Sequence, residues 1–318
     1  MNLREVRNPQ PMKVAVLYGG FSEERHSSSR SAQSIYGALE RNGHEPCLVE
    51  YDADCIAKIR DFSPDAVFQI TQGKRHGDGA AQAILELLGV PYTGSRPAAA
   101  AIINHKTACK KLCAAEGITT PDFFEYSHKE YREGGFDGFI KKAEASGLCL
   151  PIVVKPPTQG GRFGMVFVKD EESFRGIEAA FRYDDALLAE RYVEGRFITQ
   201  GLIEIDGEMT VLPPVEVVDE TGEEFRRYYE KSYCIVPELT AGQISEINLT
   251  SLAVARLTGA SGIARIDYHI SGGRIYFLEI NAAPGLTDGF SDMVYCAGFA
   301  GYTYDELISA VLASARAL

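Results

Sequence analysis

The chain of 318 residues lacks long apolar runs, and it also lacks a concentrated basic patch. No stretch approaches the ~20 consecutive apolar residues that a membrane-spanning helix needs. The N-terminal lead, "MNLREVRNPQPMKVAVLY", has no signal-peptide apolar region. We therefore expect a cytoplasmic protein without a membrane partner. Since the net charge is −12 and no basic patch offsets it, nucleic acid is not expected as a partner either.

The sequence lacks a cysteine framework, although it contains seven cysteines. An odd number of cysteines, scattered through mostly apolar segments, does not fit a set of disulfides. Cys109 and Cys113 stand four residues apart on a predicted helix, but no second pair completes a zinc site. The cysteines are therefore predicted to be buried free thiols in a reducing compartment.

Strand and helix signals are present along the chain, and they divide it into three parts. In residues 1–107, strands such as "KVAVLY" and "DAVFQIT" alternate with helices, which predicts a mostly parallel α/β domain. Residues 108–195 contain the order strand, glycine-rich loop, strand, helix, strand, which predicts a small α+β lid. Residues 196–318 begin with long alternating strands around an Asp206-Gly207 turn and contain two helices.

The segment 265–285, "RIDYHISGGRIYFLEINAAPG", is predicted to be a hairpin with an unusual polar content. Because side chains alternate across a strand, a loop with an odd number of residues would put the polar set on one face: Arg265, Asp267, Glu279 and Asn281. A two-residue loop would place Asp267 opposite Leu278. We therefore predict a three-residue loop, 271–273. The opposite face is then predicted to be apolar: Ile266, Tyr268, Ile270, Tyr276, Leu278 and Ile280.

The polar face of this hairpin suits a metal site for phosphate chemistry. Two carboxylates and an amide oxygen are ligands for a hard ion such as Mg²⁺, with Mn²⁺ as an alternative. Mg²⁺ usually keeps part of its coordination shell for water and nucleotide phosphates. Arg265 would neutralise a transferring phosphoryl group. From periodicity alone, a polar and solvated sheet face stays open as the other interpretation.

At these residues the sequence resembles the D-alanine–D-alanine ligases, a family of ATP-grasp ligases, and the order of motifs follows that family from Lys13 onward. The resemblance implies an ATP-grasp fold with three domains: a parallel α/β N-terminal domain, a small α+β lid, and a C-terminal antiparallel sheet with helices. It implies ATP-dependent joining of an amino-acid carboxylate to an amine through an acyl phosphate. It also implies small-molecule amino-acid substrates and a homodimer.

The resemblance implies a role for each matching residue. Asp267, Glu279 and Asn281 would hold magnesium, Arg265 would stabilise the phosphoryl group and the tetrahedral intermediate, and the backbone at Gly285 would help to form the oxyanion site. Glu24, in "LYGGFSEER", would bind the amino group of the first substrate. ATP would contact the remaining matches: Lys106 and Lys155 at its phosphates, Gly160 and Gly161 in the covering loop, and the backbone of Glu190 and Val193 at the adenine.

Several positions depart from the family pattern, mostly in the substrate site. Gln72 and Gly77 replace a histidine and a glutamate, and Gly161 and Arg162 replace serines in the glycine-rich loop. Phe197 replaces the glutamate that would accept hydrogen bonds from the ribose. Because a site built on specific hydrogen bonds rejects mismatched substrates, we expect substrates that are not both D-alanine. Tyr233 is predicted to match the family tyrosine of the substrate loop.

The acceptor pocket is predicted from two alternative registers. One register places Ser291 and Asp292 beside the carboxylate of the acceptor, and the other places Phe290 and Ser291 there. In the first register, like charges would repel, and D-alanine would be a poor acceptor. Two further functions stay open: an ordinary D-alanine–D-alanine ligase of peptidoglycan synthesis with compensating changes, and a catalytically silent nucleotide-binding homologue. A nicotinamide-binding protein is excluded, because "YGGFSEERHSS" lacks the G-x-G-x-x-G spacing.

Overall fold

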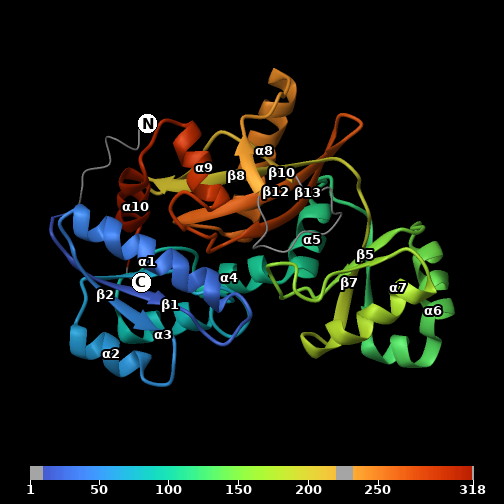
Figure 1. Cartoon of the computed structure of the whole chain (residues 1–318), viewed down its shortest axis with the longest axis horizontal. Coiled ribbons are helices and arrows are strands. Elements are labelled where there is room, and N and C mark those ends of the chain that lie inside the picture. The colour runs from blue at the N-terminus through green and yellow to red at the C-terminus, as the bar shows by residue number, and fades with distance from the viewer. Residues whose placement is uncertain (1–9, 220–231, 317–318) are drawn as a thin grey trace.

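The computed structural model of the chain describes residues 10–219 and 232–316, and these form three sheets with helices packed on their faces (Figure 1). A parallel sheet of three strands comes first, an antiparallel sheet of four strands follows, and an antiparallel sheet of six strands comes last. This order agrees with the predicted α/β and α+β classes. Within the described ranges, no helix is both long and apolar enough to cross a membrane.

The first sheet has the strand order β2-β1-β3 and is covered by helices on both faces. One face of β1 packs against α1, and the other face packs against α2 and α3. The loops that follow β1 and β3 leave the same edge of the sheet, which is where parallel sheets place ligands. The elements are β1 (Lys13–Tyr18), α1 (Arg25–Arg41), β2 (Glu45–Glu50), α2 (Cys55–Phe62), β3 (Ala66–Gln69), α3 (Ala80–Leu88) and α4 (Pro97–Asn104).

The second sheet has the order β4-β7-β5-β6, and aromatic side chains from α6 and α7 cover one face of it. Sequence patterns did not predict β4 or α6. The helix α6 departs from helical geometry at Gly135, where φ is 53°, so its apolar periodicity is interrupted. The elements are β4 (Phe123–Ser127), α6 (His128–Ala145), β5 (Ile152–Lys155), β6 (Val166–Val168), α7 (Glu171–Phe174), the 3-10 helix η2 (Arg175–Arg182) and β7 (Ala186–Arg191).

The third sheet has the order β11-β10-β8-β12-β13, with β9 paired to β8. The two-residue turn at Asp206 and Gly207 joins β8 to β9 as predicted, and both residues have positive φ. Helices α5 and α8 pack on one face. The elements are α5 (Lys106–Ala115), β8 (Arg196–Ile205), β9 (Glu208–Val211), β10 (Val215–Asp219), β11 (Ser232–Ile235), α8 (Ala241–Thr258), β12 (Ile263–Ser271), β13 (Arg274–Asn281), α9 (Asp292–Phe299) and α10 (Tyr304–Ala313).

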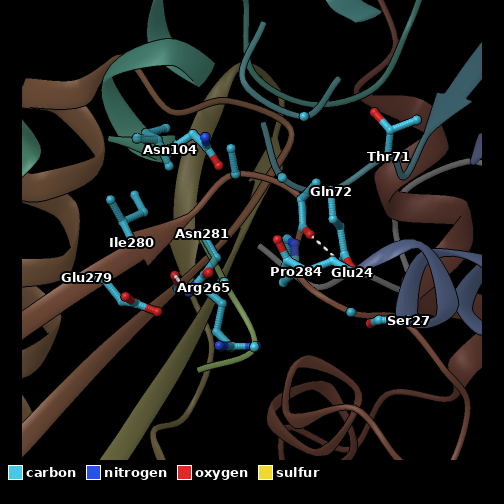
Figure 2. Close-up of a pocket in the computed structure, with 18 of the residues that line it drawn as sticks. Glu24, Ser27, Thr71, Gln72, Asn104, Arg265, Glu279, Ile280, Asn281 and Pro284 are labelled. Carbon is cyan, nitrogen blue, oxygen red and sulfur yellow. Dashed lines mark hydrogen bonds between the residues drawn. The ribbon is translucent and has the colours of Figure 1, made fainter. Parts of the chain in front are cut away.

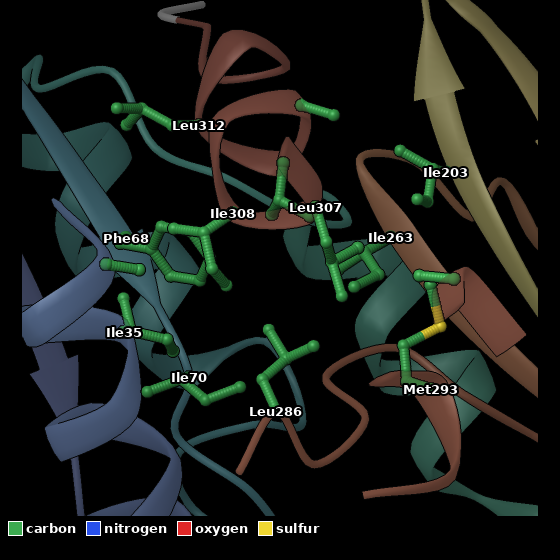
Figure 3. Packing of buried hydrophobic residues seen from close by; sticks show 14 of the residues in the cluster. Ile35, Phe68, Ile70, Ile203, Ile263, Leu286, Met293, Leu307, Ile308 and Leu312 are labelled. Carbon is green, nitrogen blue, oxygen red and sulfur yellow. The ribbon is translucent and has the colours of Figure 1, made fainter. Parts of the chain in front are cut away.

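One hydrophobic core connects the first sheet to the third. Figure 3 shows Ile35 and Phe68 from the N-terminal part facing Leu307 and Ile308 of α10, with Leu286 between the two parts. All five side chains are at most 1% exposed. This shared core holds the loops after β1 and β3 in place against the hairpin of β12 and β13. The predicted domain boundaries at 107/108 and 195/196 stay predictions.

The hairpin of β12 and β13 differs from its prediction in two respects. Its loop has two residues, because Ser271 pairs with Arg274 and the turn residues Gly272 and Gly273 have φ values of 54° and 80°. Only glycine adopts two successive positive φ values without cost, which explains the short turn. The sheet register then shifts between Asp267 and Tyr268, so one extra residue bulges from β13.

This bulge restores the predicted pairing on the polar face. Asp267 lies opposite Glu279, whereas Tyr268 lies opposite Phe277 and leaves Leu278 as the extra residue. The predicted apolar face was wrong near the turn, where it included Tyr276 and Leu278: Phe277 is 1% exposed and packs in the core in their place. Leu278 instead lines a cavity. The polar set therefore shares one side because of a bulge, and not because of an odd loop.

Candidate active site

Two adjoining cavities lie between the three sheets, one of about 120 Å³ and one of about 600 Å³. The larger cavity falls within the ~300–1,000 Å³ range of small-molecule sites. Figure 2 shows the smaller cavity, with Glu24 and Gln72 on one side and Arg265, Glu279 and Asn281 on the other. Six residues line both cavities: Lys106, Gly160, Gly161, Phe163, Arg265 and Glu279. The two cavities therefore form one site with a common wall.

On the hairpin side of the common wall, Arg265 forms an ion pair with Asp267. The Nε of Arg265 is 3.0 Å from Oδ1 of Asp267, and its Nη2 is 2.9 Å from Oδ2. Thr199, opposite Asp267 on β8, donates its hydroxyl to Oδ1 at 2.6 Å. Burial raises the pKa of Asp267, but the Arg265 charge and these hydrogen bonds outweigh it and lower the pKa. Asp267 is therefore held as a carboxylate at the edge of the larger cavity.

Glu279 and Asn281 complete the oxygen-donor set. The Nδ2 of Asn281 donates to Oδ2 of Asp267 at 3.2 Å, which leaves its Oδ1 as the oxygen that can bind an ion. Glu279 lies opposite Asp267 and is 3.4 Å from Nζ of Lys106. Within the described residues, no group of three His, Cys, Asp or Glu side chains fits a metal. Two carboxylates with one amide form the hard, oxygen-only set that Mg²⁺ prefers.

A buried ion triad lies beneath the larger cavity. Glu190 on β7 pairs with Lys155 at the end of β5, and its Oε2 is 2.9 Å from Nζ of Lys110. The side chain of Lys110 is 0% exposed, and its Nζ also donates to the hydroxyl of Thr120 at 2.6 Å. Burial raises the pKa of Glu190, but the two lysine charges outweigh it and lower the pKa to about 2. Lys155 lines the cavity and Lys110 does not.

The far end of the larger cavity is formed by the segment after β7. Nδ1 of His269 is 2.6 Å from the carbonyl oxygen of Val193. Because a carbonyl can only accept, Nδ1 carries the hydrogen. The ring of Phe197 meets the His269 ring edge-on, with centroids 5.6 Å apart, and the two residues are partners in the β8–β12 register. Burial lowers the pKa of His269.

Glu24 lies where the lid meets the N-terminal sheet. It precedes α1 and makes no side-chain capping bond to that helix. The backbone of Gly160 approaches so closely that a side chain there would collide with the Glu24 carboxylate. Burial raises the pKa of Glu24, and the nearby Lys106 charge opposes that increase. The glycine at position 160 therefore permits a close contact between the lid loop and Glu24.

The loop after β3, which contains the departure Gln72, is tied to its neighbours by side-chain contacts. Nε2 of Gln72 donates to the carbonyl of Ala283 at 2.8 Å, which connects this loop to the segment that ends at Gly285. His76 is fully buried, and its Nε2 accepts from the N–H of Phe21 at 2.7 Å. Lys74 pairs across the site with Asp184 of the lid at 2.7 Å.

The predicted acceptor residues lie beside Arg265. Asp292, at the start of α9, is 3.7 Å from Nη1 of Arg265 and accepts from the thiol of Cys234 at 3.6 Å. Burial raises the pKa of Asp292, and the Arg265 charge opposes that increase. Ser291 and Phe290 also line the larger cavity. Tyr233 pairs with Val218 through the backbone of β11, but its side chain lies outside the described residues.

The structure therefore brings together nearly all the residues that the sequence predicted, and it adds three that were missed. Thr199, Lys110 and His269 each contact a predicted residue. His269 has the parity of Arg265 and Asp267 on β12, which is a signal that the sequence contained. Thr199 and Lys110 gave no such signal, since their partners are 68 and 80 residues away.

Comparison with known proteins shows the family of the chain. A family model described as "D-ala D-ala ligase C-terminus" matches residues 112–313. The D-alanine–D-alanine ligase of Moorella thermoacetica is 35% identical over 309 residues, which cover 95% of this chain and 98% of that protein. That of Desulforudis audaxviator is 33% identical over 305 residues, covering 93% and 96%.

Solved structures show the same relationship. The D-alanine–D-alanine ligase of Bacillus anthracis complexed with ATP has a TM-score of 0.80 at 30% identity, covering 95% of this chain and 97% of that chain. A second structure of the same enzyme also has a TM-score of 0.80, at 28% identity. The predicted ATP-grasp fold is confirmed, and the chain belongs to the D-alanine–D-alanine ligase family of ATP-dependent, peptide-bond-forming ligases.

Proposed function

We propose that the protein joins two molecules of D-alanine, with ATP as the phosphoryl donor. The observation that carries this proposal is the common wall, where Arg265, Glu279 and Lys106 line both cavities and Asp267 lines the larger one beside them. The larger cavity has room for the nucleotide, and the smaller one adjoins it at the phosphate end. The relatives that match this chain in sequence and in structure are named D-alanine–D-alanine ligases.

The nucleotide occupies the larger cavity in this proposal. The adenine lies against the backbone of Glu190 and Val193, and its phosphates extend toward Lys155 and Lys106. The loop with Gly160 and Gly161 covers the phosphates, as glycine allows a backbone to approach a ligand closely. Both lysines are mostly buried, at 13% and 12% exposure, so their charges act in a site of low dielectric constant.

Asp267, Glu279 and Asn281 would hold magnesium, since their oxygens are the donors that this ion prefers. When bound, the ion supplies charge neutralisation at the phosphates. Arg265 would orient Asp267 for this role, because its Nε and Nη2 donate to both carboxylate oxygens. The positive charge of its guanidinium would also neutralise the phosphoryl group.

The reaction then has two steps. The carboxylate of the first D-alanine, whose ammonium binds Glu24, attacks the γ-phosphorus, and the bond to ADP breaks. The amine of the second D-alanine attacks the carbonyl carbon of the acyl phosphate, a proton is lost, and phosphate leaves. Arg265 and the N–H of Gly285 stabilise the tetrahedral oxyanion between these events.

A second candidate acceptor follows from Asp292. Its carboxylate lies in the larger cavity beside Arg265, where the carboxylate of a simple amino acid would be repelled. An acceptor that carries an additional cationic group would pair with Asp292 instead. This candidate keeps the same donor, metal and nucleotide sites, and it changes only the second substrate.

A product screen tests both candidates. The purified protein is incubated with ATP, Mg²⁺ and single or paired amino acids of both configurations. Phosphate release gives the rate, and mass spectrometry identifies the peptide. D-alanyl-D-alanine from D-alanine alone supports the first candidate, and a product formed only with a cationic acceptor supports the second. Absence of phosphate release with every pair would contradict the ligase activity itself.

A further inference from the structure

His269 lies between the two ends of the proposed nucleotide site. Its Nδ1 donates to the carbonyl of Val193, which belongs to the segment assigned to the adenine. Asp267, two residues earlier on β12 and on the same face, is assigned to the phosphate end. Two residues of a strand span about 6.6 Å. The part of a nucleotide that lies between its base and its phosphates is the ribose.

The contact with Val193 shows that Nδ1 of His269 carries a hydrogen. Since Nδ1 donates to a carbonyl, Nε2 of the neutral ring has a lone pair and can accept a hydrogen bond. In the described part of the chain, no residue donates to Nε2. The ring lines the larger cavity, and Phe197 packs against it edge-on without offering a polar atom.

We infer that Nε2 of His269 accepts a hydrogen bond from a hydroxyl of the nucleotide ribose. The ribose offers donors at its 2′ and 3′ positions, and the side chain of Phe197, which packs against His269 in the cavity wall, has no acceptor for them. This assignment rests on the proposed position of ATP. It also supplies a hydrogen bond at the ribose. By resemblance to the family, Phe197 replaces the glutamate that would have accepted one there.

Binding of ADP, 2′-deoxy-ADP and 3′-deoxy-ADP, measured by titration calorimetry without amino acids, tests the inference. One hydrogen bond corresponds to a difference of roughly threefold to tenfold in Kd. We expect the wild type to bind one deoxy analogue more weakly than ADP by this factor. The analogue that loses affinity identifies the hydroxyl involved.

The informative variant is His269→Asn. The side-chain amide of asparagine can still donate to the carbonyl of Val193, but it has no atom at the position of Nε2. We expect this variant to bind ADP as weakly as the wild type binds the affected analogue, and to bind both equally. Phe197→Leu is the matched control, because it removes the neighbouring ring but no polar atom, and it should keep the preference for ADP.

Two results would overturn the assignment. One is equal binding of ADP and both deoxy analogues by the wild type. The other is a preference for ADP that persists in His269→Asn. If the wild type does not bind ADP at all, the nucleotide position in the proposed function fails as well. If ADP binds without discrimination, only the role of His269 fails.

Discussion

The ion triad of Lys110, Lys155 and Glu190 gives the sharpest test of how the larger cavity works. Lys155 faces the cavity, whereas Lys110 is completely buried behind it. If Lys155 moves to bind a phosphate, Glu190 keeps Lys110 as its counter-ion. We therefore predict that Lys110→Met lowers both the stability of the fold and the affinity for ATP.

The structure sets the size of the stability effect. The charges of the two lysines outweigh burial and lower the pKa of Glu190 from 4.5 to about 2, and a net shift of this size corresponds to about 3 kcal/mol at ~1.36 kcal/mol per unit. Lys110 provides roughly half of that, and burial lowers its own pKa, which offsets part of the gain. The loss is therefore about 1–2 kcal/mol. It is smaller than the ~3–5 kcal/mol for a buried charge without any partner, because Lys155 stays.

The effect on ATP is separable from the effect on stability. In Lys110→Met, Glu190 has only Lys155 as its counter-ion. Because Lys155 can then bind a phosphate only by leaving Glu190 unpaired, the KM for ATP should rise while the KM for the amino acids changes little. Chemical denaturation gives the free energy of unfolding, and phosphate release gives the kinetic constants. Lys111→Met is the control, because Lys111 is on the same helix but is 59% exposed, and its pair with Glu125 contributes little.

The reasoning is refuted if the two lysine variants have the same free energy of unfolding and the same KM for ATP. An equal loss of stability in both would mean that the helix itself is sensitive to substitution. An unchanged KM for ATP in a destabilised Lys110→Met would mean that Lys155 does not exchange partners. Either outcome contradicts the proposed exchange of Lys155 between Glu190 and phosphate.

Four more predictions use the same assays. Glu279→Gln should abolish phosphate release with an unchanged melting temperature, because it removes a magnesium ligand; a wild-type rate would refute the metal site. Glu24→Gln should raise the KM of the first amino acid far more than that of ATP, whereas equal increases would indicate a charge that only favours the helix end. Asp292→Leu should improve the use of D-alanine as acceptor, and Asp288→Leu, which changes an exposed carboxylate, is the control. An unchanged rate with D-alanine would show that Asp292 does not belong to the acceptor pocket. The stability that the ionised Glu190 contributes through its lysine partners is complete above its unfolded pKa of 4.5 and is lost as the pH falls toward about 2. The difference in free energy of unfolding between wild type and Lys110→Met should therefore narrow over that pH range. Acid unfolding followed by circular dichroism measures this difference.

The polar face of the hairpin was predictable because its information is local. Side-chain parity alone grouped Arg265, Asp267, Glu279 and Asn281, and the structure brings them together. The loop length was predicted wrongly for the same reason. Parity constrains the total number of residues between two positions, and it does not distinguish an odd loop from an even loop with a bulge.

The parts that were missed depend on pairing between distant segments. Thr199 meets Asp267 because β8 and β12 pair in one particular register, and no local pattern specifies that register. Lys110 has the sequence appearance of a solvated helix lysine, and only the approach of β7 converts it into a buried counter-ion. The bounds of the strands were more predictable than their partners, since turn residues and apolar runs are local signals.

The departures in the loop after β3 are mutually consistent in the structure, and this bears on the choice of substrate. At Gly77 a side chain would lie 2.7 Å from the carbonyl oxygen of Thr71, so this loop has no room for the glutamate of the family pattern. The neighbouring His76 joins the N–H of Phe21 to the carbonyl of Gln72. Burial lowers the pKa of His76, so the neutral ring can accept at Nε2 and donate at Nδ1.

Gln72 extends the same chain of hydrogen bonds to Ala283, two residues before Gly285. The changes therefore replace one set of internal contacts with another and leave both Glu24 and Gly285 lining the smaller cavity. Together, these contacts keep the pocket of the first substrate in place. This favours D-alanine as the first substrate, as in the family. Asp292 differs from these loop residues, because it lines the larger cavity beside the arginine that the reaction needs. If one of the two substrates differs from D-alanine, the structure therefore favours the acceptor.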